Sequence, residues 1–449
     1  MTTLNVQQFL DQQPFSGLQK RLLALCFLIV AIDGFDTASI GFIAPALRAE
    51  WQLGTMALAP LFGAGLFGLM AGALLLGPLA DRYGRKPVLL GSVGFFGLAC
   101  LLSSFANDLG TLLVLRFLTG LGLGGAMPTT VTLTSEYCPQ PRRAGLVTLM
   151  FCGFTIGSAL GGLVAAQLLD AVGWRGILVS GGAAPLLLAP VLALALPESL
   201  RWLVLRGRDG SAIAARIAGP GAAVPRLTVS DARLPGSPVS QLFRPDLLMG
   251  TLLLWTAFFM SLLIIYLLSS WLPTLLNAAG HKLSQASFIS SAFQIGGTLG
   301  AILLGRWMDR HRPHRVLALA YLAAAACIAG VGLFMDSVPL LVLAVFGVGF
   351  GVSGSQVGAN ALSAAFYPTT SRATGVSWAN AIGRSGSVVG STAGAALLSA
   401  QLSNQVIFLL LAIPAVLAAL ALLAMSRLQQ RPAPAPAAPL TPTRETSIP

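Results

Sequence analysis

Charged residues are scarce in this chain. Asp, Glu, Lys and Arg make up 9% of its 449 residues, whereas soluble domains carry about 25%. Hydrophobic residues make up 55%, and the mean hydropathy is +0.80. This composition excludes an ordinary soluble domain and indicates a protein that crosses a membrane several times.

The sequence also has few residues of the kinds that form metal or catalytic centres. It contains three histidines and five cysteines, with no CxxC pair and no His at metal-ligand spacing. No nucleophile–base pair and no Walker loop is visible. We therefore expect neither an enzyme nor a cofactor. The net charge of +12 does not indicate a nucleic-acid partner, because the basic residues lie in loops between apolar segments.

Twelve apolar segments are long enough to cross a bilayer, which takes about 20 helical residues. The predicted fold class is an all-α membrane protein with twelve transmembrane helices in two six-helix halves. The predicted spans are about Leu22–Leu47, Thr55–Ala80, Pro87–Ala106, Gly110–Ser135, Gly145–Ala171, Trp174–Leu196, Leu247–Leu272, Ser284–Trp307, His314–Phe334, Val338–Phe366, Ala373–Ser399 and Asn404–Met425. The predicted divisions are an N-terminal segment 1–21, a first half 22–196, a polar central loop 197–246, a second half 247–426 and a disordered tail 427–449.

Basic residues divide unevenly between the two sides of this predicted bundle. Of the 27 Lys and Arg residues, 22 lie in the loops and tails on the side of both termini, and 3 lie on the opposite side. Basic loops remain on the cytoplasmic side of a membrane. The sequence thus predicts a multi-pass protein of the bacterial inner membrane with both termini and the central loop in the cytoplasm.

Two short motifs recur at nearly constant spacing. GPLADR at 77–82 returns as GRWMDR at 305–310, and EYCPQPRRAG at 136–145 returns loosely as FYPTTSRATG at 366–375. The first motif recurs at an offset of 228 residues, and Arg143 and Arg372 of the second are 229 residues apart; such near-constant offsets are hard to obtain by chance. Two repeated halves place a substrate site at their interface, near the bilayer midplane.

The first predicted span carries two carboxylates near its middle, Asp33 and Asp36. A central Asp disfavours insertion by about 2.5–3.5 kcal/mol, and a spacing of three residues puts both on one helix face. We interpret them as a site for protons or substrate; the alternative is a structural pair of acids neutralised by buried Arg. Arg116, about two turns inside the fourth span, also needs a counter-ion, and Asp36 is the predicted partner. The alternative for Arg116 is snorkelling to the outer interface.

The eleventh predicted span holds a second basic group, Arg384, near mid-membrane. A guanidinium binds a carboxylate through two charge-assisted hydrogen bonds, and few acids are available in the second half. We expect Arg384 to bind the carboxylate of a ligand; the alternative is an Arg paired only with protein acids. Trp378 is a candidate to stack on an aromatic ring, and Asn380 to bond a hydroxyl. The predicted substrate site also includes Asp36, with further polar candidates, each as readily explained by an interhelical hydrogen bond, at Tyr266, Gln294, Gln356 and Asn360.

The loop between the second and third spans reads GPLADRYGRK, residues 77–86. Its carboxylate, Asp81, is ringed by basic residues, and such a cluster can hold two halves together by charge pairing and release them on tilting. The alternative is a cluster that only fixes topology. The loop closely resembles the signature of the major facilitator superfamily, and the second-half copy stands where that family has it. The resemblance implies the major facilitator fold and a gate formed by Gly77, Asp81, Arg82, Arg85, Lys86, Glu136, Arg143, Asp309 and Arg310.

A longer stretch in the first predicted span indicates a more specific family. DGFDTASIGFIAPAL, residues 33–47, resembles the signature of the aromatic acid:proton symporter family, which includes the hydroxybenzoate permeases, and the GRSG setting of Arg384 is similar to that family too. The resemblance implies import of a benzoate-type anion with protons by alternating access, with Asp33, Asp36 and Arg116 in proton coupling. The expected partners are a small aromatic carboxylate, protons and the lipid bilayer, and the expected state is a monomer. Other cargoes on this scaffold, another organic acid or a sugar, stay open, as does a membrane enzyme or sensor.

Overall fold

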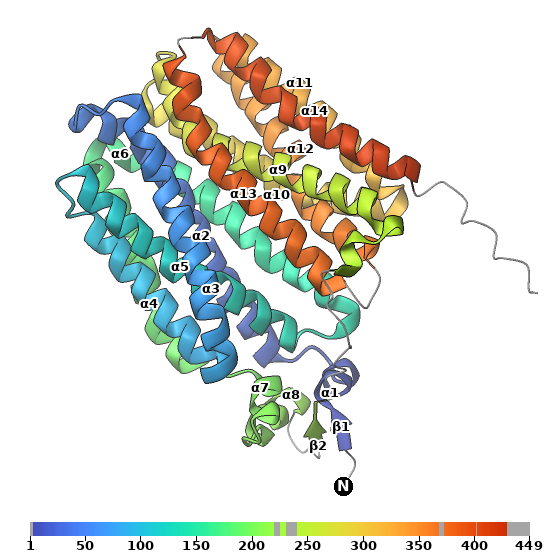
Figure 1. Cartoon of the computed structure of the whole chain (residues 1–449). Coiled ribbons are helices and arrows are strands. Elements are labelled where there is room, and N and C mark those ends of the chain that lie inside the picture. Colours follow the sequence, from blue (N-terminus) through green and yellow to red (C-terminus); the bar gives the residue numbers. More distant parts are fainter. Residues whose placement is uncertain (1–2, 220–224, 230–239, 368–371, 401, 429–449) are drawn as a thin grey trace, which may run out of the picture.

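Long helices account for most of the molecule (Figure 1). The computed structural model describes residues 3–219, 225–229, 240–367, 372–400 and 402–428, so most of the predicted tail lies outside the described residues. The elements are β1 Thr3–Asn5, α1 Val6–Gln12, α2 Gly17–Glu50, η1 Thr55–Ala57, α3 Leu58–Tyr83, α4 Arg85–Ser103, α5 Leu109–Tyr137, η2 Gln140–Arg142, α6 Arg143–Ala195, α7 Leu200–Leu205, α8 Ser211–Ala218, β2 Arg226–Thr228, η3 Ser240–Phe243, α9 Pro245–Ala278, α10 Leu283–Arg310, α11 Pro313–Leu333, α12 Val338–Phe366, α13 Arg372–Ser399 and α14 Asn404–Leu428. The prediction of an all-α membrane fold is confirmed.

The number of membrane crossings depends on two helices. Among the described residues, ten helical segments are long and apolar enough to span a membrane. One of them contains α6, whose 53 residues are interrupted at Gly173 by a turn with φ 64° and ψ −176°, a conformation that glycine adopts readily, so α6 makes two passes. Helix α13 is not among the ten, although its 28 residues are long enough to cross. Counting α6 twice and adding α13 gives the twelve predicted crossings.

Glycine allows close helix pairs in both halves. A Cβ atom on Gly120 of α5 would lie 2.0 Å from the carbonyl oxygen of Gly65 on α3. In the second half, a Cβ on Gly300 of α10 would lie 2.2 Å from the carbonyl oxygen of Phe350 on α12. Small residues give helices in lipid this close backbone approach. The pairs α3–α5 and α10–α12 occupy equivalent places in the two repeats.

The two halves, α2–α6 and α9–α14, meet mainly through α2 with α9, α3 with α13, and α6 with α10. We call the end of the bundle that carries β1 and α1 the terminal end, and the opposite end the far end. A Cβ on Gly41 would lie 2.2 Å from the carbonyl oxygen of Ser269, and the ring of Phe62 packs edge-on against Trp271 with centroids 4.8 Å apart. These contacts lie toward the far end, so the structure is closed there.

Segments expected to be polar loops form an ordered cap on the terminal end of the first half. Strand β1 pairs in parallel with β2, with Leu4 opposite Leu227. Helix α1 is joined to the start of α6 by two contacts: the Gln140 backbone N–H donates to Asp11 at 2.6 Å, and Arg143 donates to Gln7. The N-terminal segment and the central segment therefore lie together beneath the first half (Figure 1).

Helix α5, which carries Arg116, begins at a charged cap. The Thr111 hydroxyl and backbone N–H donate to the Asp108 carboxylate at 2.6 and 2.9 Å. These hydrogen bonds, the hydroxyl first, hold the pKa of Asp108 below its usual range. Arg116 lies eight residues further along, roughly 12 Å of helix, and so lies well inside the membrane-spanning part.

Candidate functional site

A complete ion pair lies inside the first half. Arg116 of α5 donates to both carboxylate oxygens of Asp36 on α2, each at 3.0 Å. The Cys100 thiol of α4 donates a third hydrogen bond to Asp36 at 3.0 Å. The Asp36 side chain is fully buried and that of Arg116 is 5% exposed. The structure thus contains the predicted pairing, and the alternative of an Arg116 that snorkels outward does not fit it.

Asp33 lies one helical turn before Asp36 but in a different setting. Its residue is 3% exposed, and the hydroxyl of Thr37 donates to it at 3.2 Å. Among the described residues no Lys, Arg or His forms an ion pair with it at contact distance. It lies near enough to Asp36 and to Arg384 of the other half for these charges to interact. Asp33 is therefore a buried acid with one neutral donor.

Arg384 is a mid-membrane charged residue of the second half. It is half-buried on α13, and its guanidinium donates to the hydroxyl of Tyr266 on α9 at 2.8 Å. No acid whose side chain the structure describes forms an ion pair with it. Most of the donor groups of this guanidinium thus remain available to a bound anion.

A small cavity lies at the interface between the halves, beside Arg116 and Tyr266. Thr37, Arg116, Tyr266 and Ser270 are among its lining residues, and its volume is about 40 Å³. Tyr266 therefore contacts Arg384 on one side and the cavity beside Arg116 on the other. Binding sites for small organic molecules occupy about 300–1,000 Å³, so an aromatic acid requires this space to widen.

Three further residues predicted at the substrate site form hydrogen bonds with side chains of other helices. Asn380 donates to the side chain of Asn360 at 3.4 Å, which joins α13 to α12. Gln294 donates to Ser269 at 3.2 Å. These three side chains are occupied in interhelical or neighbouring contacts, as the alternative interpretation has it.

Trp378 does not lie with Arg384. Its ring stacks on Trp255 of α9 with centroids 5.8 Å apart, and the residue is 39% exposed. Six residues along a helix amount to a rotation of about 240° between the two positions. Trp378 and Arg384 therefore leave α13 from different faces in this structure, and the contact of Trp378 with a bound aromatic ring stays a prediction.

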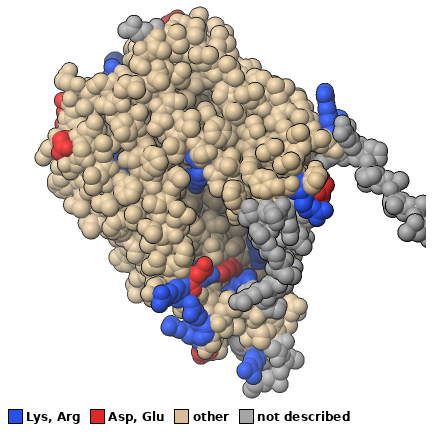
Figure 2. Space-filling model, in the orientation of Figure 1, with Lys and Arg blue, Asp and Glu red and all other residues tan. Residues whose placement is uncertain are grey.

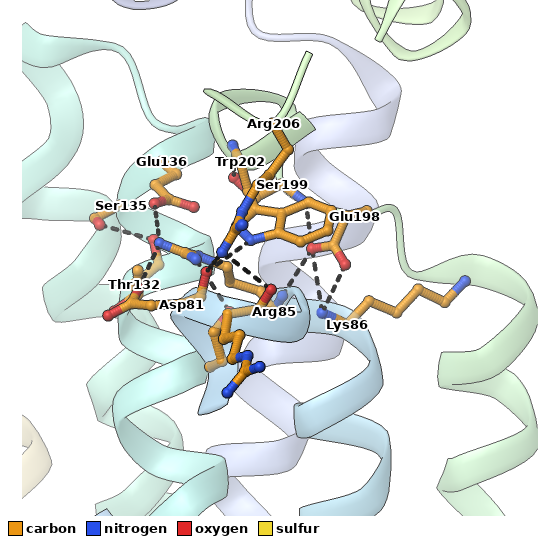
Figure 3. A network of polar contacts seen from close by, with 12 residues as sticks. Asp81, Arg85, Lys86, Thr132, Ser135, Glu136, Glu198, Ser199, Trp202 and Arg206 are labelled. Atoms are coloured by element: carbon orange, nitrogen blue, oxygen red, sulfur yellow. Dashed lines mark hydrogen bonds and ion pairs between the residues drawn. The ribbon is translucent and has the colours of Figure 1, made fainter. Parts of the chain in front are cut away.

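The signature loop forms a tight cluster at the terminal end (Figure 3). Arg85, at the start of α4, forms ion pairs with Asp81 at 2.9 Å and with Glu136 of α5 at 3.2 Å. Its guanidinium also donates to the Ala80 carbonyl at 3.1 Å. Among the described residues, the ion pairs of this cluster all stay within the first half. The loop thus joins α3, α4 and α5.

Glu198 is a member of this cluster that the sequence did not single out. Its carboxylate accepts the backbone N–H groups of Arg85 at 2.9 Å and Lys86 at 3.2 Å. Gly84 has φ +113°, and a Cβ there would lie 2.3 Å from a Glu198 oxygen, so only glycine fits. The available signal was an isolated acid directly after the sixth span, among basic residues on the same side as the signature loop.

The other predicted gate residues are dispersed. Arg143 donates to Gln7 of α1, Arg82 lies over the ring of Tyr83 at 5.4 Å, and Lys86 donates to the Ala193 carbonyl at 2.7 Å. Gly77 has open space around it. Arg310 is exposed, and the side chain of Asp309 lies outside what the structure describes.

Comparison with known proteins agrees with this architecture. The family model of the Major Facilitator Superfamily matches residues 26–335 and 254–448. The chain is 46% identical to a gallate transporter of Pseudomonas putida over 97% of this chain and 98% of that protein. It is also 46% identical to the 4-hydroxybenzoate transporter PcaK of the same organism, over 93% of this chain and 94% of that one. Among solved structures, a D-xylose-proton symporter superposes with a TM-score of 0.69 at 19% identity, covering 90% of this chain and 97% of that one.

Proposed function

The chain belongs to the major facilitator superfamily and is a transporter, and on this premise we propose that it imports an aromatic carboxylate of the hydroxybenzoate or benzoate type together with protons. The relatives named as gallate and 4-hydroxybenzoate transporters support this class of substrate. The proposed location is the bacterial inner membrane, with the chain acting as a monomer and both termini in the cytoplasm. Lys and Arg side chains gather near α1, α7 and α8 at the terminal end (Figure 2), which supports that orientation.

Arg384 carries the proposal, because it is a mid-membrane guanidinium bonded to a neutral phenol rather than to a described carboxylate. A cation in the bilayer core is costly unless it is paired. A substrate carboxylate supplies the missing charge and can form two charge-assisted hydrogen bonds with the guanidinium. Tyr266 orients Arg384, and Asn360 and Asn380 offer hydrogen bonds to ring substituents when the halves separate.

Asp33 is the proposed proton carrier. Asp36 already accepts three hydrogen bonds, two of them from Arg116, so ionised Asp36 is well satisfied. Asp33 has one neutral donor, Thr37, and lies within range of the Arg384 charge. Binding of a substrate anion at Arg384 removes the favourable cation from Asp33 and so favours its protonation. Asp36 and Arg116 take part in coupling by fixing the position of α2.

The charge of the cargo supports coupling to protons. Moving one anion into a cell that is negative inside opposes the membrane field by about 2.3 kcal/mol per 100 mV. One co-transported proton cancels this electrical term, and a second makes the field assist uptake. An acid beside the anion site provides the means to carry that proton with the substrate.

Transport proceeds by alternating access in this proposal. The halves are in contact toward the far end through Gly41 and Phe62, so substrate leaves toward the terminal end in this state. Opening of the far end requires the halves to rock about the site between Asp33 and Arg384. The cluster of Asp81, Arg85, Glu136 and Glu198 holds the terminal end of the first half rigid during this motion. Gly77, Arg82, Lys86, Arg143, Asp309 and Arg310 complete the proposed gate.

The test is uptake of radiolabelled 4-hydroxybenzoate into proteoliposomes with an imposed inward proton gradient. We expect accumulation that an uncoupler abolishes, and loss of substrate binding in Arg384→Ala. Arg427→Ala, an exposed Arg at the end of α14, is the matched control and retains uptake. A panel with benzoate, a dicarboxylate and a sugar identifies the cargo class.

Two results contradict the proposal. Normal affinity for hydroxybenzoate in Arg384→Ala removes the assigned carboxylate site. Accumulation of a sugar, with no aromatic acid taken up, overturns the substrate class while leaving the transporter role intact.

A further inference from the structure

A long groove runs along the outside of the second half, between α10 and α11, with α12 beneath it. Its volume is about 1200 Å³. The walls are mostly apolar, and two of the side chains that line it, Trp307 and Leu319, are 58% and 65% exposed. In a membrane this groove therefore opens toward lipid rather than toward the site between the halves.

One end of the groove is strongly basic. Arg310, Arg312 and Arg315 line it together with His311, and all four residues are exposed. The stretch 306–315 contains four Arg and one Asp. None of these three Arg forms an ion pair with an acid whose side chain the structure describes. The groove thus combines an apolar channel with unneutralised guanidinium groups at its terminal end.

The first half has more acids at the equivalent positions. There, Arg85 is neutralised by Asp81 and Glu136, and Glu198 caps the helix that follows. At the offset of 228 residues, the position of Arg85 is taken by Pro313. Where the first half has Glu136, the second half has the apolar Ala365 and Phe366. The second half therefore keeps an acid, Asp309, at the position of Asp81 but has none at the position of Glu136, so it has fewer acids beside its basic residues than the first half.

The length of the groove matches one leaflet of a bilayer. Its α11 wall extends from Arg315 to Cys327, roughly 18 Å of helix. Half of a bilayer's hydrocarbon core is roughly 15 Å thick. A chain lying along Leu319 and Ala323 thus ends near mid-membrane when its headgroup is at Arg315.

We propose that this groove binds an anionic phospholipid. The headgroup phosphate contacts Arg310, Arg312 and Arg315, since guanidinium groups bind phosphate in a bidentate manner. The acyl chains lie between Trp307 and Leu319. Basic pockets between transmembrane helices on the cytoplasmic side recognise anionic headgroups in this way. The site does not require the substrate or the proton coupling proposed above.

The test is native mass spectrometry of the whole protein in detergent with dioleoylphosphatidylglycerol or dioleoylphosphatidylcholine. We expect the anionic lipid to bind at least about tenfold more tightly. A variant with Arg310→Gln, Arg312→Gln and Arg315→Gln loses this preference, whereas Ala323→Phe, which fills the apolar channel, weakens binding of both lipids. The matched control replaces three exposed Arg residues outside the groove, Arg21→Gln, Arg142→Gln and Arg427→Gln, and keeps the preference.

Three results overturn the proposal. The first is a preference for the anionic lipid that survives in the triple groove variant, and the second is an equal loss of this preference in the control. The third is displacement of the lipid by soluble glycerol 3-phosphate at similar concentration, which would indicate an anion site without lipid. Thermal unfolding of each variant without added lipid shows whether it is folded. If the triple variant does not fold, Ala323→Phe decides, because unchanged lipid binding in that variant also contradicts the groove.

Discussion

The molecule has two mid-membrane sites where acid and guanidinium come near each other, and they differ in completeness. Asp36 and Arg116 belong to the same half and are buried, and Arg116 donates two hydrogen bonds of 3.0 Å to Asp36. Asp33 and Arg384 belong to different halves, and each is bonded to a neutral hydroxyl, of Thr37 or Tyr266. A saturated pair fixes helix positions, whereas an unsaturated one can exchange partners. On this basis we propose that the first pair is structural and that the second is available for transport.

The largest expected effect comes from breaking the saturated pair. Arg116→Ala leaves the Asp36 carboxylate buried without its cation, which costs about 3–5 kcal/mol. We expect a large fall in the melting temperature and in the yield of folded protein. The double variant Asp36→Asn with Arg116→Gln recovers part of the loss, because no buried charge remains. Equal stability of Arg116→Ala and the wild type would show that the pair does not fix the first half.

Asp33→Asn removes the proposed proton site without breaking an ion pair. The amide still accepts the Thr37 hydrogen bond, so we expect the melting temperature to change little. Gradient-driven accumulation of hydroxybenzoate is lost, while exchange of internal for external substrate continues. Both are measured in proteoliposomes with and without a proton gradient. If Asp33→Asn still accumulates substrate against its gradient, the proton is carried elsewhere.

Tyr266→Phe tests whether the hydrogen bond from Arg384 to Tyr266 orients the guanidinium for substrate. Hydrogen bonds to charged groups contribute about 1.5–3 kcal/mol, and loss of this one leaves Arg384 less well oriented. We expect the KM for the aromatic acid to rise about tenfold. Trp378→Phe is the control on α13, and its KM stays close to that of the wild type because Trp378 stacks on Trp255. A larger effect at Trp378 than at Tyr266 would reverse the assignment.

The smallest effect is expected at Cys100, the third donor to Asp36. Cys100→Ala removes one hydrogen bond and lowers the free energy of unfolding by about 0.5–1.5 kcal/mol. Cys100→Ser keeps a donor at this position and retains more stability. Chemical unfolding of the two variants side by side measures the difference. Identical stability in both would mean that the thiol contact with Asp36 contributes nothing.

The saturated pair was predictable from the sequence, and the reason is energetic. A buried Arg in an apolar span demands a counter-ion, and the first span carries acids near its middle, of which Asp36 was the predicted partner. The two passes within α6 were also predictable, because Gly173 lies between two apolar runs of membrane-spanning length. Composition and the free-energy cost of placing a charge in the membrane are sufficient to predict features of this kind.

The face on which a side chain leaves its helix was not predictable in the same way. Trp378 and Arg384 are both on α13, and only the packing of α9 against it decides that Trp378 meets Trp255. Glu198 was missed for a related reason: it contacts the backbone of Arg85 across a sequence separation of 113 residues. Such contacts depend on how helices are rotated and on where a connecting segment folds back.

The parallel pairing of β1 with β2 has a consequence for how the protein is made. Thr3 is synthesised more than 220 residues before its partner Arg226. At a translation speed of about 5–20 residues per second, β1 waits roughly 10 to 45 s for β2 to be synthesised. By then all helices of the first half have been translated. Pairing of the two strands can therefore take place only after the first half is complete.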